Sequence, residues 1–168
     1  MVKRLFKNKK GFMSIYVIIA LSVFVPISLF VSIDMPYMMT MNRKIKNTLD
    51  NASSTAITCI NEEMASRGVI NINSSEAEAM AKRVIKESFG LEDDLSVNKN
   101  SLISDAPTVT IKVINNPTAE PTYKTPNGNF NIQNPSVIIY AEVPVQAKFL
   151  RMAKPVIKYT AISQAQFK

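Results

Sequence analysis

The sequence predicts an α+β fold in which a single N-terminal transmembrane helix continues into a long amphipathic helix. This rod is expected to pack, with a second helix, on a small antiparallel sheet. Three observations lead to the prediction. A charge-free apolar run extends from Phe12 to Ile33, and apolar residues then recur every three or four positions up to residue 60. In the final third they alternate with polar residues, and these two spacings are the periods of helix and strand.

Residues 12–33 are long and apolar enough for a membrane-spanning helix. Such a helix needs about 20 residues, which at about 1.5 Å each cover a hydrocarbon core of about 30 Å. Pro26 removes one backbone hydrogen bond from the middle of this helix and is expected to bend it. A buried helix of a soluble core and a cleaved secretory signal are the alternatives. A signal is disfavoured because the run is too long and exits through Asp34 without a small-residue cleavage site.

The formal net charge of +7 over 168 residues is concentrated at the N-terminus. Five basic residues lie in the first ten positions, which leaves 15 basic against 13 acidic residues in the rest. Lys and Arg beside a span stay on the cytoplasmic side. Residues 1–11 are therefore predicted to be a cytoplasmic tail and the C-terminal part to be extracytoplasmic, with basic residues at 43, 44 and 46 as a weaker opposing signal. Because this basicity is topological, no nucleic-acid partner is predicted.

Residues 34–66 are predicted to form an amphipathic stalk helix that continues the span, and Pro36 is the residue that can kink their junction. The apolar stripe includes Met41, Ile45 and Leu49, and Gly68 is a natural stop. Such a stripe needs a partner. We expect the protein's own outer domain to cover its far half, and Met41, Ile45 and Leu49 in the near half to contact sister helices.

Residues 67–168 are predicted to form an extracytoplasmic α+β domain. Ser74 or Ser75 is expected to cap a second helix that ends at Gly90. Alternation predicts strands at 109–113, 136–149 and 156–167, with Pro144 at an edge or bulge and a short strand near 95–97. Residues 116–135 are predicted to be a long exposed loop, in which Asn127-Gly128 is a turn signal that also fits a hairpin tip.

Catalytic apparatus is hard to find in this sequence. It has no histidine, a single cysteine and only four scattered glycines, so we expect no enzyme, no metal site and no cofactor. Cys59 is expected to be a small packing residue, and Glu142 to lie on the solvent face of a strand. The acidic residues 92–94 lack the alternate spacing of a calcium loop and are expected to form a solvated turn.

Two stretches suggest a family. The run KKGFMSIYVIIALSVFVPISLFVSIDMPYMMTMNRKIKNTLDNASSTA resembles the N-terminal region of TadE- and TadG-like proteins of the tight-adherence (Flp) pilus system. The shared features are basic residues before Gly11, a charge-free span with a proline, the acid Asp34 at its outer end, and a basic-polar helix entering LDNASSTA. The C-terminal VIIYAEVPVQAKFLRMAKPVIKYTAISQAQF is similar to the paired final strands of TadE-like domains.

The resemblance implies a membrane-anchored minor pilin-like subunit or assembly factor of a pilus or secretion machine in a bacterial cell membrane. Its implied partners are the lipid bilayer, other pilin-like subunits and the pilus machinery, with Tyr16, Pro26 and Asp34 among the packing residues. A prepilin peptidase would cleave between Gly11 and Phe12, although Tyr16 occupies the place where many pilins carry glutamate. The alternative is a single-pass membrane protein whose extracytoplasmic binding or sensor domain does not polymerise.

Overall fold

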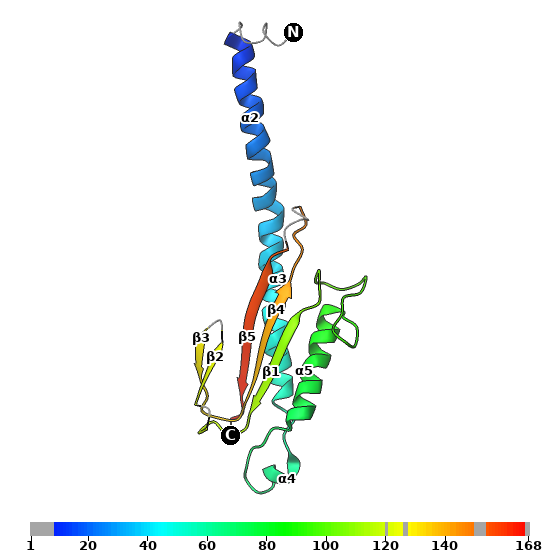
Figure 1. Cartoon of the computed structure of the whole chain (residues 1–168), viewed down its shortest axis with the longest axis vertical. Coiled ribbons are helices and arrows are strands. Elements are labelled where there is room, and N and C mark those ends of the chain that lie inside the picture. The colour runs from blue at the N-terminus through cyan, green and yellow to red at the C-terminus, as the bar shows by residue number, and fades with distance from the viewer. Residues whose placement is uncertain (1–8, 120, 126–127, 150–153, 167–168) are drawn as a thin grey trace.

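A computed structural model describes residues 9–119, 121–125, 128–149 and 154–166. It confirms the predicted α+β architecture, with a long N-terminal helix, a second long helix and a small antiparallel sheet. Figure 1 shows that the first part of the long helix projects away from the rest of the chain, whereas its second part lies along the sheet. We call the part from Met35 onward the domain.

The projecting helix and the domain share one unbroken helical backbone. Helix α2 (Lys9–Leu29), the π-helical turn η1 (Phe30–Asp34) and helix α3 (Met35–Ala56) follow one another directly. Together they measure about 70 Å at the helical rise. Pro26 lies inside α2 and Pro36 follows the π turn at the start of α3, so each removes one backbone donor from this continuous helix.

The prediction of a stalk helix over residues 34–66 is wrong beyond Ala56, where α3 ends. Serine and threonine at positions 53–55 are weak helix formers. Ile60 instead forms a bridge with Ile72, and Asn61 then caps the short helix α4 (Glu62–Ala65) by accepting from the Met64 N–H at 3.2 Å. The chain therefore leaves the axis of the long helix at Ala56 and does not extend it to residue 66.

Helix α5 (Ser74–Phe89) is confirmed, but Asn73 caps it instead of Ser74 or Ser75. The Asn73 side chain accepts from the Glu76 N–H at 3.4 Å. Gly90 ends the helix in the left-handed region with φ 66°. A Cβ at this position would lie 3.2 Å from the Asn100 carbonyl oxygen, so the residue must be small as well as left-handed.

Three strands form the main sheet in the antiparallel order β1 (Thr108–Ile114), β4 (Ser136–Pro144) and β5 (Val156–Gln164). Pro144, predicted at an edge or bulge, is the last residue of the central strand, where no further ladder bond is needed. The expected strand near 95–97 is reduced to a single bridge between Leu91 and Val97.

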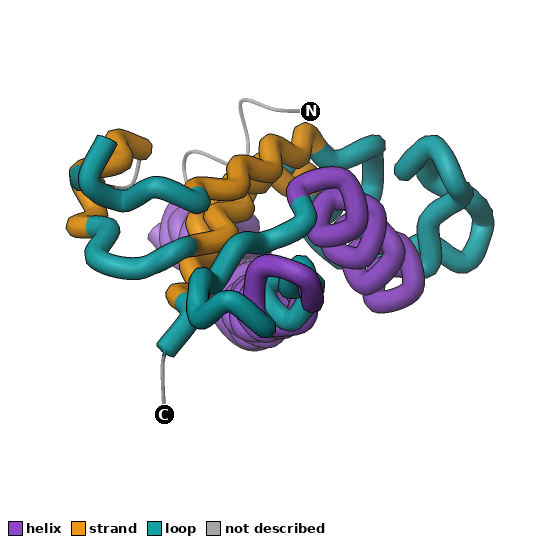
Figure 2. The backbone as a smooth tube through the Cα atoms, turned by 90° about the horizontal axis from the view of Figure 1, so that it is seen from below, coloured by secondary structure: helices purple, strands orange, loops and turns teal. Residues whose placement is uncertain are grey.

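Helices α3 and α5 cover one face of this sheet (Figure 2). Alternate β4 residues point toward them because successive side chains of a strand face opposite sides. The resulting core is apolar and includes Ile45, Leu49, Ile85, Phe89, Val137, Ile139, Ala141 and Val143.

The predicted loop 116–135 contains a hairpin, the alternative that the Asn127-Gly128 turn signal indicated, and this hairpin covers part of the other face of the sheet. Its strands are β2 (Thr122–Thr125) and β3 (Gly128–Asn131). Tyr123, Phe130 and Ile132 pack against Ile114 and Ile138 of the sheet, and the Lys112 ammonium lies 4.9 Å from the centroid of the Tyr123 ring. Gly128 has φ 136°, in keeping with the predicted turn, whereas Asn127 lies outside the described residues.

Candidate functional site

The projecting helix is the first candidate site because it exposes apolar side chains on all sides. Val17, Ile18 and Ile19 are all more than half exposed, although successive residues point about 100° apart. None of the described residues in the apolar part of this helix is buried within the chain. A helix that is apolar all round belongs in a membrane or among other apolar helices. This one is long and apolar enough to cross a membrane.

Polar groups on this helix are compatible with an apolar environment. The Ser22 hydroxyl donates to the Ile19 carbonyl at 2.7 Å, which satisfies it within the helix. Tyr16 is exposed on the projecting part, and so is Pro26. Gly11 and Phe12, the predicted processing site, lie in the first turns of α2. Their processing stays a prediction.

Asp34 joins the projecting helix to the domain. Its side chain is completely buried, and its Oδ1 accepts a hydrogen bond from the Phe149 N–H at 2.7 Å. The neighbouring π turn closes with a bond from the Met35 N–H to the Phe30 carbonyl. Burying a carboxylate is costly unless it is hydrogen-bonded. Asp34 therefore holds Phe149, in the segment after β4, at the point where the apolar run ends.

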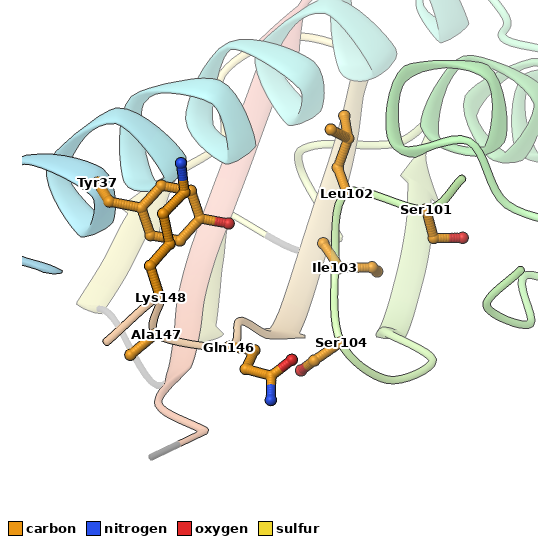
Figure 3. Close-up of a pocket in the computed structure, with 8 residues that line it drawn as sticks. All are labelled: Tyr37, Ser101, Leu102, Ile103, Ser104, Gln146, Ala147 and Lys148. Atoms are coloured by element: carbon orange, nitrogen blue, oxygen red, sulfur yellow. The ribbon is translucent and has the colours of Figure 1, made fainter. Parts of the chain in front are cut away.

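A polar cavity of about 440 Å³ lies beside this junction, between the start of α3, residues 101–104 and residues 146–148 (Figure 3). The Lys148 ammonium lies 4.8 Å from the centroid of the Tyr37 ring, an attractive cation–π distance. Among the described residues that line the cavity, Lys148 is the only charged one, and none is a histidine, cysteine or carboxylate. The cavity can therefore hold polar groups.

The predicted stalk contacts are wrong. Met41, Ile45 and Leu49 are 4%, 0% and 0% exposed, because they pack into the protein's own core against α5 and the sheet. These side chains are not available to a sister helix. The sequence showed correctly that the stripe needs a partner, but it did not show that the domain supplies this partner along the whole of α3.

The accessible apolar surface near the junction is instead a methionine groove that sequence reasoning missed. It has a volume of about 450 Å³ and is lined by Phe30, Met35, Met38, Met39, Asn42, Ile157 and Lys158. Met35 and Met39 are about half exposed. The only signal in the sequence was the high methionine content of this segment, and flexible thioethers suit adaptable contacts.

The remaining polar candidates are dispersed. Glu142 accepts from the Tyr140 hydroxyl at 2.6 Å and from the Lys158 ammonium at 2.9 Å on the outer face of the sheet, and these bonds lower its pKa. Burial, with a smaller contribution from Glu76, raises the pKa of the Cys59 thiol, so this residue packs rather than reacts. Within the described residues, no three His, Cys, Asp or Glu side chains are grouped to hold a metal ion.

Comparisons of the chain with protein-family models, with curated proteins and with solved structures found no match.

Proposed function

We propose that this chain is a membrane-anchored minor pilin-like subunit or assembly factor of a TadE/TadG-like (Flp-type) pilus or secretion machine. It would act by helix packing and not by catalysis. One observation carries the proposal. A single continuous helix closes the core of the domain with its second half and exposes apolar side chains on every side of its first half. The resemblance of residues 9–56 to the TadE and TadG N-terminal region supports the same assignment.

The physical basis of assembly is an exchange of contacts. A helix that is apolar all round can leave lipid and pack on neighbouring apolar helices with little loss of apolar burial. Because α2 continues into α3 without a flexible linker, movement of the anchor carries the domain with it. The methionine groove lies at the base of the anchor and is the surface of the domain best placed to contact a neighbouring subunit.

In this proposal the basic N-terminal residues stay in the cytoplasm of a bacterium and the domain lies outside the membrane. Peptidase cleavage would occur between Gly11 and Phe12.

N-terminal sequencing of the chain recovered from sheared surface fibres and from membranes tests the proposal. A chain in the fibres that begins at Phe12 supports the minor subunit. An intact chain found only in the membrane, and copurifying with a secretion ATPase, supports the assembly factor. An intact membrane chain with neither association contradicts both and favours the single-pass binding module, for which the polar cavity at Tyr37 and Lys148 is the candidate ligand site.

A further inference from the structure

The residues that follow β4, up to Phe149, reach the long helix where the apolar run ends. The Phe149 N–H donates to Asp34, and Asp34 directly follows Ile33, the last residue of that run. Figure 1 shows the segment directly after β4 at the end of the domain from which the helix projects. The backbone of Phe149 is therefore held at the outer end of the candidate span.

The length of the helix sets the depth of this segment in a bilayer. Met13 to Ile33 measures about 30 Å at the helical rise, equal to the thickness of a hydrocarbon core. A bilayer that covers this segment places Asp34 and Phe149 at the inner edge of the outer headgroup layer. That layer is about 5–7 Å thick, so residues one turn beyond Asp34 still lie within it.

The side chains at this depth suit a lipid interface. Phe149 is 40% exposed, and Lys148 is exposed with its ammonium over the ring of half-buried Tyr37. Aromatic rings favour the headgroup layer, and a lysine can keep its ammonium among phosphates while its carbon chain lies on apolar surface. Exposed Met35 extends the apolar surface of the helix at the same level.

We propose that Lys148 and Phe149, together with Tyr37, form a second contact with the outer leaflet, in which Phe149 enters the lipid and Lys148 faces phosphate groups. The proposal rests on the membrane anchoring in the proposed function but not on assembly. Lipid is the occupant because it surrounds an anchored helix on every side at this depth. Two contacts fix the orientation of the domain relative to the bilayer, which a single helix alone does not.

Tryptophan fluorescence tests the contact, because the chain has no tryptophan of its own. The full chain carrying Phe149→Trp is reconstituted into phosphatidylcholine vesicles with added phosphatidylglycerol, with and without lipids brominated near the headgroup. Phe24→Trp, in the middle of the helix, is the control for the span. Val69→Trp, exposed beside α4 at the far end of the domain, is the control for solvent.

We expect shallow brominated lipids to quench Phe149→Trp, deep ones to quench Phe24→Trp, and neither to quench Val69→Trp. Lys148→Glu should reduce the quenching of Phe149→Trp, whereas Lys148→Arg should retain it. If Phe24→Trp is quenched and Phe149→Trp is not, the lipid contact of Phe149 is overturned and the membrane anchor still stands. A blue-shifted but unquenched Phe149→Trp means that protein covers the loop, which also overturns the proposal. An unquenched Phe24→Trp refutes the membrane anchor itself.

Discussion

Replacing Asp34 should weaken the domain, although the residue lies at the end of the candidate span. Asp34→Ala removes a buried acceptor and leaves the Phe149 N–H without that partner, which lies at 2.7 Å in the native protein. A hydrogen bond to a charged group contributes about 1.5–3 kcal/mol. We therefore expect a loss of ~2 kcal/mol in the free energy of unfolding, or roughly 10 °C in the midpoint of a domain of this size.

The measurement is thermal unfolding of the full chain in detergent micelles, followed by circular dichroism, with limited proteolysis to monitor the loop after β4. Asp34→Asn is the matched control because its side-chain oxygen can still accept from the Phe149 N–H. It should lose less stability than Asp34→Ala and keep more of the loop's protease resistance. If Asp34→Ala unfolds at the wild-type temperature with an unchanged loop, the reasoning that Asp34 fixes this loop is refuted.

Three further predictions concern the domain. Ile45→Ala should lower the free energy of unfolding by about 2–4 kcal/mol because the Ile45 side chain is fully buried, whereas Lys46→Ala, at an exposed position, should change it by less than about 0.5 kcal/mol. Denaturant unfolding in micelles compares the two variants, and equal effects would contradict the assigned core. Glu142 has a lowered pKa in the folded state. Its contribution to the free energy of unfolding is therefore present above its unfolded pKa of about 4.3 and is lost as pH falls through the lower folded value. Glu142→Gln should flatten that part of the curve of stability against pH, and an unchanged curve would contradict the prediction. Gly90→Ala should lower the melting temperature more than Gly68→Ala, because both glycines have positive φ but, of the two, only Gly90 has an atom within 4 Å of the added Cβ. Equal melting temperatures would contradict a steric role for the Asn100 carbonyl.

Helices and strands were predictable from the sequence where a regular spacing of apolar residues was long and uninterrupted. Strands were predicted at 109–113, 136–149 and 156–167, and the structure confirms all three, although the second ends at Pro144 and the third at Gln164. The stripe ending at Gly90 predicted α5. The end of α3 was not predictable from breakers alone. Ala56 is followed by no proline or glycine until Gly68, and the bridge between Ile60 and Ile72 that competes with the helix is a tertiary contact.

The sequence indicated where the exposed helix lies, but not which side chains of the neighbouring domain are exposed or buried. The apolar run and the acid after it identified the exposed helix and Asp34. A helical stripe, however, does not reveal whether its partner is the same chain or another, so Ile45 and Leu49 were assigned to the wrong contact. The Phe149–Asp34 bond joins residues that are 115 positions apart, and no local pattern indicates such a contact.

Disulfide cross-linking of the exposed helix in living cells tests the central claim, which is that this helix packs on copies of itself when subunits assemble. In a Cys59→Ala background, Val17→Cys combined with Ile19→Cys places two thiols about 200° apart around the helix. Both native side chains are more than half exposed. Val69→Cys, beside α4, is the control. The account predicts oxidation-dependent species larger than dimers from the double variant and none from the control. Monomers from both would contradict it.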